Sequence, residues 1–264
     1  MSSPQQAATG ETVLRTGGLT KKFGELVAVD DVSIGVKEGE LRAVIGPNGA
    51  GKTTTFNCIT GVTAPTEGSV YFRDEDITDT PEEKRPHLGL ARSFQSNQLF
   101  ADETVLENVR IAVQTEVMGT FSLKILTDGR DFHRDRAYEL LDLLGLRTVE
   151  DTKAKNLSHG DQRRLGIAMA LAAKPDVLLL DEPTSGMSPS ATTEAANLIE
   201  DIQADLGLTL VLIEHDMDVV LSISDRITVL HRGEELATGT PEEIRANEEV
   251  QDAYLGGLKE EIDV

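Results

Sequence analysis

Cysteine, aromatic residues and positive charge are scarce in this sequence of 264 residues, and tryptophan is absent. The single cysteine, Cys58, excludes a disulfide within the chain, and its place in a helical stretch favours a small buried apolar side chain. No apolar run approaches the ~18 residues that a membrane-spanning helix needs. Residues 1–10 lack the basic start and the apolar stretch of a secretory signal. We therefore expect any membrane role to be peripheral and to pass through a partner that spans the bilayer.

Positive charge is outweighed by negative charge, with 25 Lys plus Arg against 46 Asp plus Glu and a net charge of -21. Binding to nucleic acid or to anionic lipid requires cationic side chains, so neither is expected as a direct partner. Arginines outnumber lysines by 15 to 10. An acidic surface with few lysines suits a protein that stays soluble in concentrated salt, and an ordinary acidic cytoplasmic protein is the alternative.

The apolar pattern predicts an α/β fold. Three short apolar runs are typical of parallel strands that are covered on both faces: Leu41 to Ile45, Val177 to Leu180 and Thr209 to Ile213. Helical stretches at 161–174 and 190–206 alternate with the last two runs. Residues 1–12 are expected to form a disordered leader, and residues 121–146 to be mainly helical.

Three expected helix starts share one capping pattern. Each has a threonine at the N-cap and a glutamate three residues later, which can close a capping box: Thr80 with Glu83, Thr104 with Glu107, and Thr240 with Glu243. Proline follows the first and third threonines, at the first helical position that it favours.

The strongest motif is Gly46-Pro47-Asn48-Gly49-Ala50-Gly51-Lys52-Thr53-Thr54, which fits the pattern G-x-x-x-x-G-K-[ST] between a strand and a helix. Its glycines allow backbone N–H groups to approach phosphate oxygens, and the helix N-terminus adds partial positive charge. Lys52 is expected to reach the β and γ phosphates, and the Thr53 hydroxyl to ligate Mg²⁺. A glycine-rich turn with a chance lysine is the alternative, and the flanking strand and helix argue against it.

Two carboxylates follow the strand Val177 to Leu180. Asp181 would hold Mg²⁺ directly or through water. Glu182 would lie beyond the γ-phosphate, where a carboxylate can polarise a water molecule. A solvated acidic pair is the alternative, and the position after a P-loop on a similar strand favours the catalytic interpretation.

A second anion-binding helix start lies in Leu157-Ser158-His159-Gly160-Asp161-Gln162. One nucleotide does not need two such helix starts from the same chain, so another molecule would present its phosphate here. An ordinary N-cap explains the segment equally well. His215 follows the strand Thr209 to Ile213 and could contact a γ-phosphate, although a lone loop histidine is more often simply exposed. Gln95 and Phe23 have no interpretation from their residue types alone.

Taken in order, these residues resemble the ATP-binding cassette family. The matching pieces stand in the family's order over about Val13 to Gly257: the P-loop at 46–54, Gln95, the signature segment at 157–162, Asp181-Glu182 and His215. The resemblance implies a P-loop NTPase core of residues 13–95 and 157–264, with a mostly parallel sheet and an N-terminal antiparallel β subdomain. It also implies an inserted helical subdomain at 96–156 that contacts a membrane subunit.

The resemblance also assigns roles to single residues. Phe23 matches the aromatic residue that stacks on adenine, and Gln95 the glutamine that touches Mg²⁺ and the attacking water. Ser158 and Gly160 match positions that bind the γ-phosphate of ATP held by a second subunit. Two cassettes would then close head to tail around two ATP molecules, and residues 185–189 match the loop that crosses that interface.

Two positions of the signature segment depart from its commonest form. His159 stands where a glycine is frequent, and Asp161 where a glutamine is frequent. Within the family, the chain is most similar to the larger ATP-binding subunit of branched-chain amino acid importers. This likeness rests on residues 89–95, 104–109 and 237–244, with a tail at 253–256, and related urea, amide and lipopolysaccharide-export cassettes share much of it.

These observations predict an ATP- and Mg²⁺-dependent ATPase on the cytoplasmic face of the cell membrane that drives import through ATP-driven dimer closure. The expected partners are transmembrane permease subunits, a second cassette that is identical or different, and, indirectly, an extracytoplasmic solute-binding protein. The alternatives are a cassette for urea, amides or another solute, a soluble cassette acting on DNA or the ribosome, a P-loop kinase or GTPase, and a non-catalytic nucleotide-binding regulator. The chain lacks the long coiled coil or second cassette of the soluble type and the guanine-reading loop of a GTPase.

Overall fold

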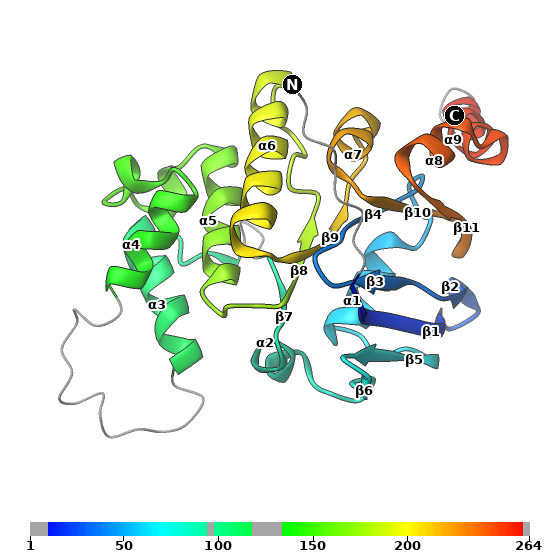
Figure 1. Ribbon diagram of the computed structural model, residues 1–264, viewed down its shortest axis with the longest axis horizontal. Helices are drawn as coiled ribbons and strands as arrows, with labels where there is room; N and C mark the ends of the chain where they lie inside the picture. Colours follow the sequence, from blue (N-terminus) through cyan, green and yellow to red (C-terminus); the bar gives the residue numbers. More distant parts are fainter. Residues whose placement is uncertain (1–9, 94–97, 118–133, 261–264) are drawn as a thin grey trace.

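The computed structural model describes residues 10–93, 98–117 and 134–260, and its core is a six-stranded sheet (Figure 1). The strand order is β11-β10-β4-β9-β8-β7, with parallel pairing from β10 to β7 and antiparallel pairing between β10 and β11. The bounds are β4 (Leu41–Ile45), β7 (Leu90–Arg92), β8 (Val177–Asp181), β9 (Thr209–Ile213), β10 (Arg226–His231) and β11 (Glu234–Gly239). The α/β fold class and the three expected parallel strands are thus confirmed.

A second sheet is antiparallel throughout its described pairs, with the order β2-β1-β5-β6 and β3 beside β1. Its strands are β1 (Thr12–Phe23), β2 (Leu26–Val32), β3 (Gly35–Lys37), β5 (Glu67–Phe72) and β6 (Glu75–Asp76). Thr12, the end of the expected leader, already pairs with Lys37 in this sheet. Residues 1–9 lie outside the described part of the chain.

Nine helices fall within the described residues. They are α1 (Lys52–Thr60), α2 (Arg85–Leu88), α3 (Val105–Val117), α4 (Arg134–Leu143), α5 (His159–Leu171), α6 (Pro189–Leu206), α7 (Met217–Ile223), α8 (Pro241–Ala246) and α9 (Glu248–Glu260). In Figure 1, α3 and α4 lie at the end of the molecule opposite to the antiparallel sheet. Both fall within 96–156, the expected inserted subdomain, whose bounds stay a prediction. No helix in the described ranges is long and apolar enough to cross a membrane.

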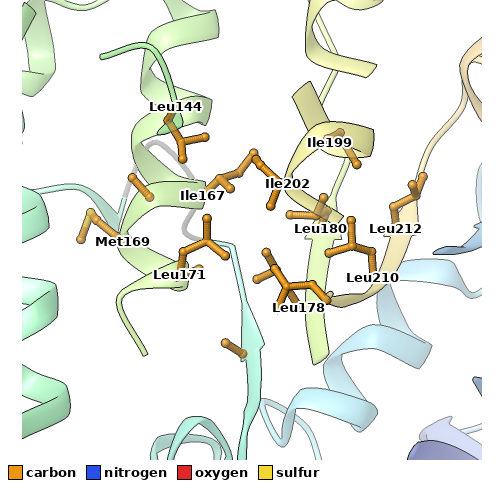
Figure 2. Packing of buried hydrophobic residues seen from close by; sticks show 14 of the residues in the cluster. Leu144, Ile167, Met169, Leu171, Leu178, Leu180, Ile199, Ile202, Leu210 and Leu212 are labelled. Atoms are coloured by element: carbon orange, nitrogen blue, oxygen red, sulfur yellow. The ribbon is translucent and has the colours of Figure 1, made fainter. Parts of the chain in front are cut away.

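Alternate residues of the core strands enter two different hydrophobic clusters, because successive strand side chains point to opposite faces. Leu178 and Leu180 of β8 face the helices, whereas Val177 and Leu179 face the cluster that contains Phe56 of α1 and the antiparallel sheet. Figure 2 shows the helical side, where β8 and β9 meet α5 and α6 through Ile167, Leu171, Leu178, Leu180, Ile199, Ile202, Leu210 and Leu212. A sheet covered on both faces explains the continuous apolar runs, and it holds the strand ends rigidly.

Two of the three expected helix starts are confirmed by their hydrogen bonds. Thr240 forms a complete capping box with Glu243, and the Thr104 hydroxyl accepts the N–H of Glu107 at 3.1 Å. The start at Thr80 is wrong: a short 3₁₀ turn begins after Pro81 without a side-chain cap. The Thr80 carbonyl instead accepts a hydrogen bond from buried Arg85, whose guanidinium also binds carbonyls at the end of α1. Of the expected helix at 121–146, α4 is described, and residues 118–133 lie outside the described part.

Candidate functional site

The P-loop follows β4 and ends where α1 begins, at Lys52. Gly51 occupies the N-cap with a positive φ of 100° and no side-chain cap, so the first N–H groups of α1 stay available at the loop. A Cβ at Gly46 would lie 2.1 Å from the carbonyl oxygen of Leu230, and one at Gly51 would lie 2.6 Å from that of Ala28. Neither position has room for a side chain, so the loop is fixed against β10 and β2.

Lys52 is 5% exposed, and its Nζ donates hydrogen bonds to the carbonyl oxygens of Gly46 at 2.6 Å and Pro47 at 3.0 Å. Burial lowers the pKa of Lys52, and the nearby carboxylates of Glu182 and Asp181 act in the opposite direction. The predicted lysine and both predicted carboxylates therefore share one electrostatic site. A buried ammonium bonded to neutral carbonyls is stabilised further by an anionic ligand, which forms stronger, charge-assisted hydrogen bonds.

Glu182 is held from three sides at the end of β8. Its N–H donates to the Ile213 carbonyl at 3.0 Å, its carbonyl accepts from a guanidinium nitrogen of Arg163, and its Oε1 meets Nε2 of His215. The backbone φ of Glu182 is 49°, a left-handed value that a non-glycine residue adopts at a cost. The structure thus brings the predicted pair Glu182 and His215 together. Arg163, two residues beyond Asp161, was not predicted, because its contact depends on how α5 packs on β8.

Asp181 is paired with a cation that the sequence analysis assigned no role. A guanidinium nitrogen of Arg92 contacts Oδ2 of Asp181, and the other, Nη1, donates to Oδ1 of Asn57 at 2.8 Å. Arg92 ends β7, which runs parallel to β8 at the edge of the sheet. The sequence analysis predicted no strand at 90–92, and the adjacency of β7 and β8 is not visible in residue spacing.

The residues present fit a magnesium ion that arrives with nucleotide. In the described ranges, no group of three or more His, Cys, Asp or Glu side chains could hold a metal ion by itself. Magnesium commonly takes one or two protein ligands and completes its shell with phosphate oxygens and water. Asp181 and the exposed Thr53 at the start of α1 are oxygen donors of the required kind. Magnesium ligation by these residues stays a prediction.

The signature segment is arranged differently, since its polar groups are bonded to one another. Ser158 caps α5: its Oγ accepts the N–H of Asp161 at 3.1 Å and donates to Oδ2 of the same residue at 2.8 Å. Ser158 and His159 are exposed, and a Cβ on Gly160 would meet nothing closer than 3.8 Å. The segment is an open surface on this chain, and its phosphate contacts stay predictions.

The remaining predictions concern Phe23, Gln95 and residues 185–189. Phe23, at the β1–β2 turn, is 53% exposed and stands near exposed Leu26, and the Nζ of Lys21 lies 5.1 Å from its ring centroid. An uncovered aromatic ring of this kind is suited to stacking on a base. Gln95 lies outside the described residues. Residues 185–189 lead into α6, which Ser188 caps.

Comparison with known proteins gives consistent findings. A family profile described as ABC transporter matches residues 29–185, and one described as branched-chain amino acid ATP-binding cassette transporter matches residues 234–258. The chain is 43% identical over 253 residues to the high-affinity branched-chain amino acid transport ATP-binding protein LivG of Salmonella typhimurium, covering 93% of this chain and 98% of the relative.

Two solved structures are also similar. One is the ADP conformation of an ATP-binding cassette of an ABC transporter, with a TM-score of 0.81, 32% identity, and coverage of 93% of this chain and 99% of the other. The second is a dimeric post-hydrolysis state of an ATP-binding cassette bound to ADP and Pi, with a TM-score of 0.74, 30% identity, and coverage of 86% and 98%.

Proposed function

The chain belongs to the ABC transporter family as an ATP-binding, ATP-hydrolysing cassette, and on that premise we propose that it powers the import of branched-chain amino acids. The observation that carries the proposal is the pairing of two features in one chain. A buried P-loop site holds Lys52, Asp181 and Glu182 together, and the exposed signature segment begins a second helix, α5.

Nucleotide binding follows from the P-loop. N–H groups of the P-loop and of the first turn of α1, together with the buried ammonium of Lys52, bind the phosphates, because fixed donors in a buried site need little reorganisation. Lys52 exchanges its carbonyl partners for phosphate oxygens, which are stronger acceptors. Phe23 stacks on the adenine at the exposed edge of the antiparallel sheet.

Hydrolysis is assigned to Glu182 as the general base. Its carboxylate would accept a proton from the attacking water, and hydrogen bonds with Arg163 and Ile213 hold its backbone carbonyl and N–H. His215 fixes the carboxylate and steadies the γ-phosphate. Magnesium, when bound with ATP, neutralises charge on the phosphates, and Asp181, Thr53 and Gln95 are the residues that would hold it.

Dimer closure gives the signature segment a ligand. Ser158 and Gly160 would contact the γ-phosphate of ATP on a second cassette, either a second copy of this chain or a different cassette. Contacts that exist only in the closed state shift the population toward it, and hydrolysis removes them. The similarity to a dimeric cassette bound to ADP and Pi supports this arrangement.

The membrane partners would dock in a groove between the core and α3. This groove has a volume of about 700 Å³ and is lined by residues of α2, α3, α5 and β7 and of the loops next to them, including His87, Leu88, Phe100, Ile111 and Met169. Its lining is mainly apolar, with charged residues such as Glu83, Lys174 and Asp176 among it. A permease segment that presents apolar side chains matches this surface, and it would place the cassette on the cytoplasmic face of the membrane.

The solute is proposed from the relatives. LivG is a branched-chain amino acid transport protein by name, and the match at residues 234–258 is to a branched-chain amino acid cassette. These residues are remote from any solute, which the permease and an extracytoplasmic binding protein would select. Reconstitution with those subunits in proteoliposomes tests the proposal: leucine-loaded binding protein should stimulate ATP hydrolysis, and urea-loaded binding protein should not.

The ATPase mechanism is tested by Glu182→Gln. Turnover should fall roughly 10²- to 10⁴-fold, the usual contribution of a general base, while nucleotide binding persists and closed dimers accumulate with ATP. Light scattering after size exclusion measures the dimer. Glu234→Gln, which neutralises an exposed carboxylate on β11, is the matched control. Near-normal hydrolysis in the Glu182 variant would refute the assigned role.

A further inference from the structure

Arg92 joins three elements of the nucleotide site: its own strand β7, the end of β8 and the helix α1. We propose that Arg92 is a positioning residue that pairs with Asp181 while nucleotide is absent and yields this carboxylate when Mg·nucleotide binds. Arg92 thereby sets how much magnesium adds to nucleotide affinity. The inference rests on the proposed role of Asp181 as a magnesium ligand.

The register of the sheet explains the reach of Arg92. Its Cα pairs with Leu179, two residues before Asp181, so the long guanidinium side chain extends along β8 to the strand end. The same guanidinium donates to Asn57. Asn57 stands four residues after Thr53 on α1, so the two lie on one face of the helix. Arg92 therefore connects the carboxylate and the helix face that together are expected to hold magnesium.

Burial makes this pairing consequential. The Asp181 side chain is 6% exposed and that of Arg92 is 20% exposed, so water replaces a lost partner poorly. A buried carboxylate needs a neighbouring cation, and it is costly when that cation is removed. Arg92 supplies one before nucleotide arrives. Two cations at the same carboxylate repel each other, so magnesium ligation has to work against this ion pair.

Arg136 forms an ion pair that is more exposed than that of Arg92. Arg136 pairs with Glu139 at 3.0 Å on α4, with side chains 31% and 65% exposed, and within the described residues this ion pair involves no predicted nucleotide-site residue. Exposed pairs of this kind contribute little. Arg136→Gln therefore removes the same charge as Arg92→Gln without touching Asp181, and it serves as the matched control.

The test is a calorimetric titration of ADP in Mg²⁺ and in EDTA. Arg92→Gln should leave the affinity for ADP in EDTA within about twofold of the wild type. The gain from Mg²⁺, meaning the ratio of the ADP affinity in Mg²⁺ to that in EDTA, should increase roughly tenfold, within the coupling range of residues in one salt-bridge network. The melting temperature of the nucleotide-free protein should fall, and Mg·ADP should recover the difference. Arg136→Gln should match the wild type. An unchanged or smaller gain from Mg²⁺ in Arg92→Gln would overturn the inference.

Two further variants keep the test decisive. If Arg92→Gln does not fold, Asn57→Ala provides a second test, because it removes the other hydrogen-bond partner of the Arg92 guanidinium. The gain from Mg²⁺ should then differ from that of the wild type, and an unchanged gain would count against the inference. Asp181→Asn tests the premise, since it should abolish the gain from Mg²⁺. Persistence of the gain in Asp181→Asn would defeat the magnesium role of Asp181. An abolished gain there, with an unaltered gain in Arg92→Gln, would defeat only the role of Arg92.

Discussion

The two helix starts that we propose to bind phosphate differ in how many of the binding groups this chain itself supplies. At the start of α1 the Lys52 ammonium is buried, and the loop is fixed by backbone contacts. Arginines from other elements contact Asp181 and Glu182. At the start of α5 the serine is exposed and bonded to its own turn. Buried donors keep their strength, whereas water competes for exposed ones until a partner covers them. Under the proposed function, the start of α1 binds phosphate by itself, whereas the start of α5 would bind it only in a closed dimer.

Lys52→Ala tests the P-loop site at the start of α1, the self-contained half of the comparison. It should have the largest effect of Lys52→Ala, Ser158→Ala and Asp161→Gln. Removing one partner of a buried charge pair costs roughly 2–5 kcal/mol, so ATP affinity of the isolated chain should fall on the order of a hundredfold. Titration of the monomer with nucleotide measures this loss. Lys155→Ala, which removes an exposed lysine paired with Asp102 at 2.6 Å, is the control. Unchanged affinity in Lys52→Ala would mean that phosphate binds elsewhere.

The self-contained half is also the one that local sequence predicts best. The apolar runs at Leu41 and Thr209 coincide with β4 and β9, and the run at Val177 extends by one residue into Asp181. Such strands are covered on both faces, so their composition alone marks them. The P-loop glycines are recognisable because the loop requires them: at Gly51 the positive φ of 100° favours glycine, and the Ala28 carbonyl leaves no room for a Cβ.

Local sequence patterns do not predict the contacts that arginines from other elements make with the two carboxylate residues. Arg92 reaches Asp181 only because β7 lies beside β8, and Arg163 reaches Glu182 only because α5 packs across the strand end. Neither adjacency is encoded in residue spacing. Thr80 fails as a cap for a related reason, since buried Arg85 draws its carbonyl into a tertiary network that outweighs the local capping pattern.

Ser158→Ala tests the partner-dependent half. Nucleotide affinity of the monomer should be unchanged, because Ser158 contributes nothing to its own chain's P-loop. ATP-driven association, measured in the Glu182→Gln background, should weaken roughly 10- to 100-fold, as expected for a lost hydrogen bond to a charged group. A larger effect on monomer binding than on association would reverse the contrast between the two halves.

Loss of helix stability is an alternative explanation for weaker association in Ser158→Ala, and a control variant separates the two. Ser158 caps α5, and loss of a cap costs about 1 kcal/mol of stability. Thr240→Ala removes a comparable cap from α8, away from the signature segment. It should lower the melting temperature by a similar amount while leaving association intact. A matching loss of association in Thr240→Ala would attribute the effect of Ser158→Ala to stability.

Asp161→Gln should have the smallest effect and the opposite sign. In this chain the Ser158 hydroxyl donates its hydrogen bond to the Asp161 carboxylate, so the serine presents its lone pairs, beside a negative charge, to an approaching phosphate. Removing that charge frees the hydroxyl to donate and should strengthen ATP-driven association roughly twofold to fivefold, in line with exposed charge interactions. The gain should shrink as salt rises, because exposed charges are screened. Asp201→Gln, on the exposed face of α6, controls for net charge alone, and an equal gain there would place the effect in overall repulsion between two acidic chains instead of in the signature segment.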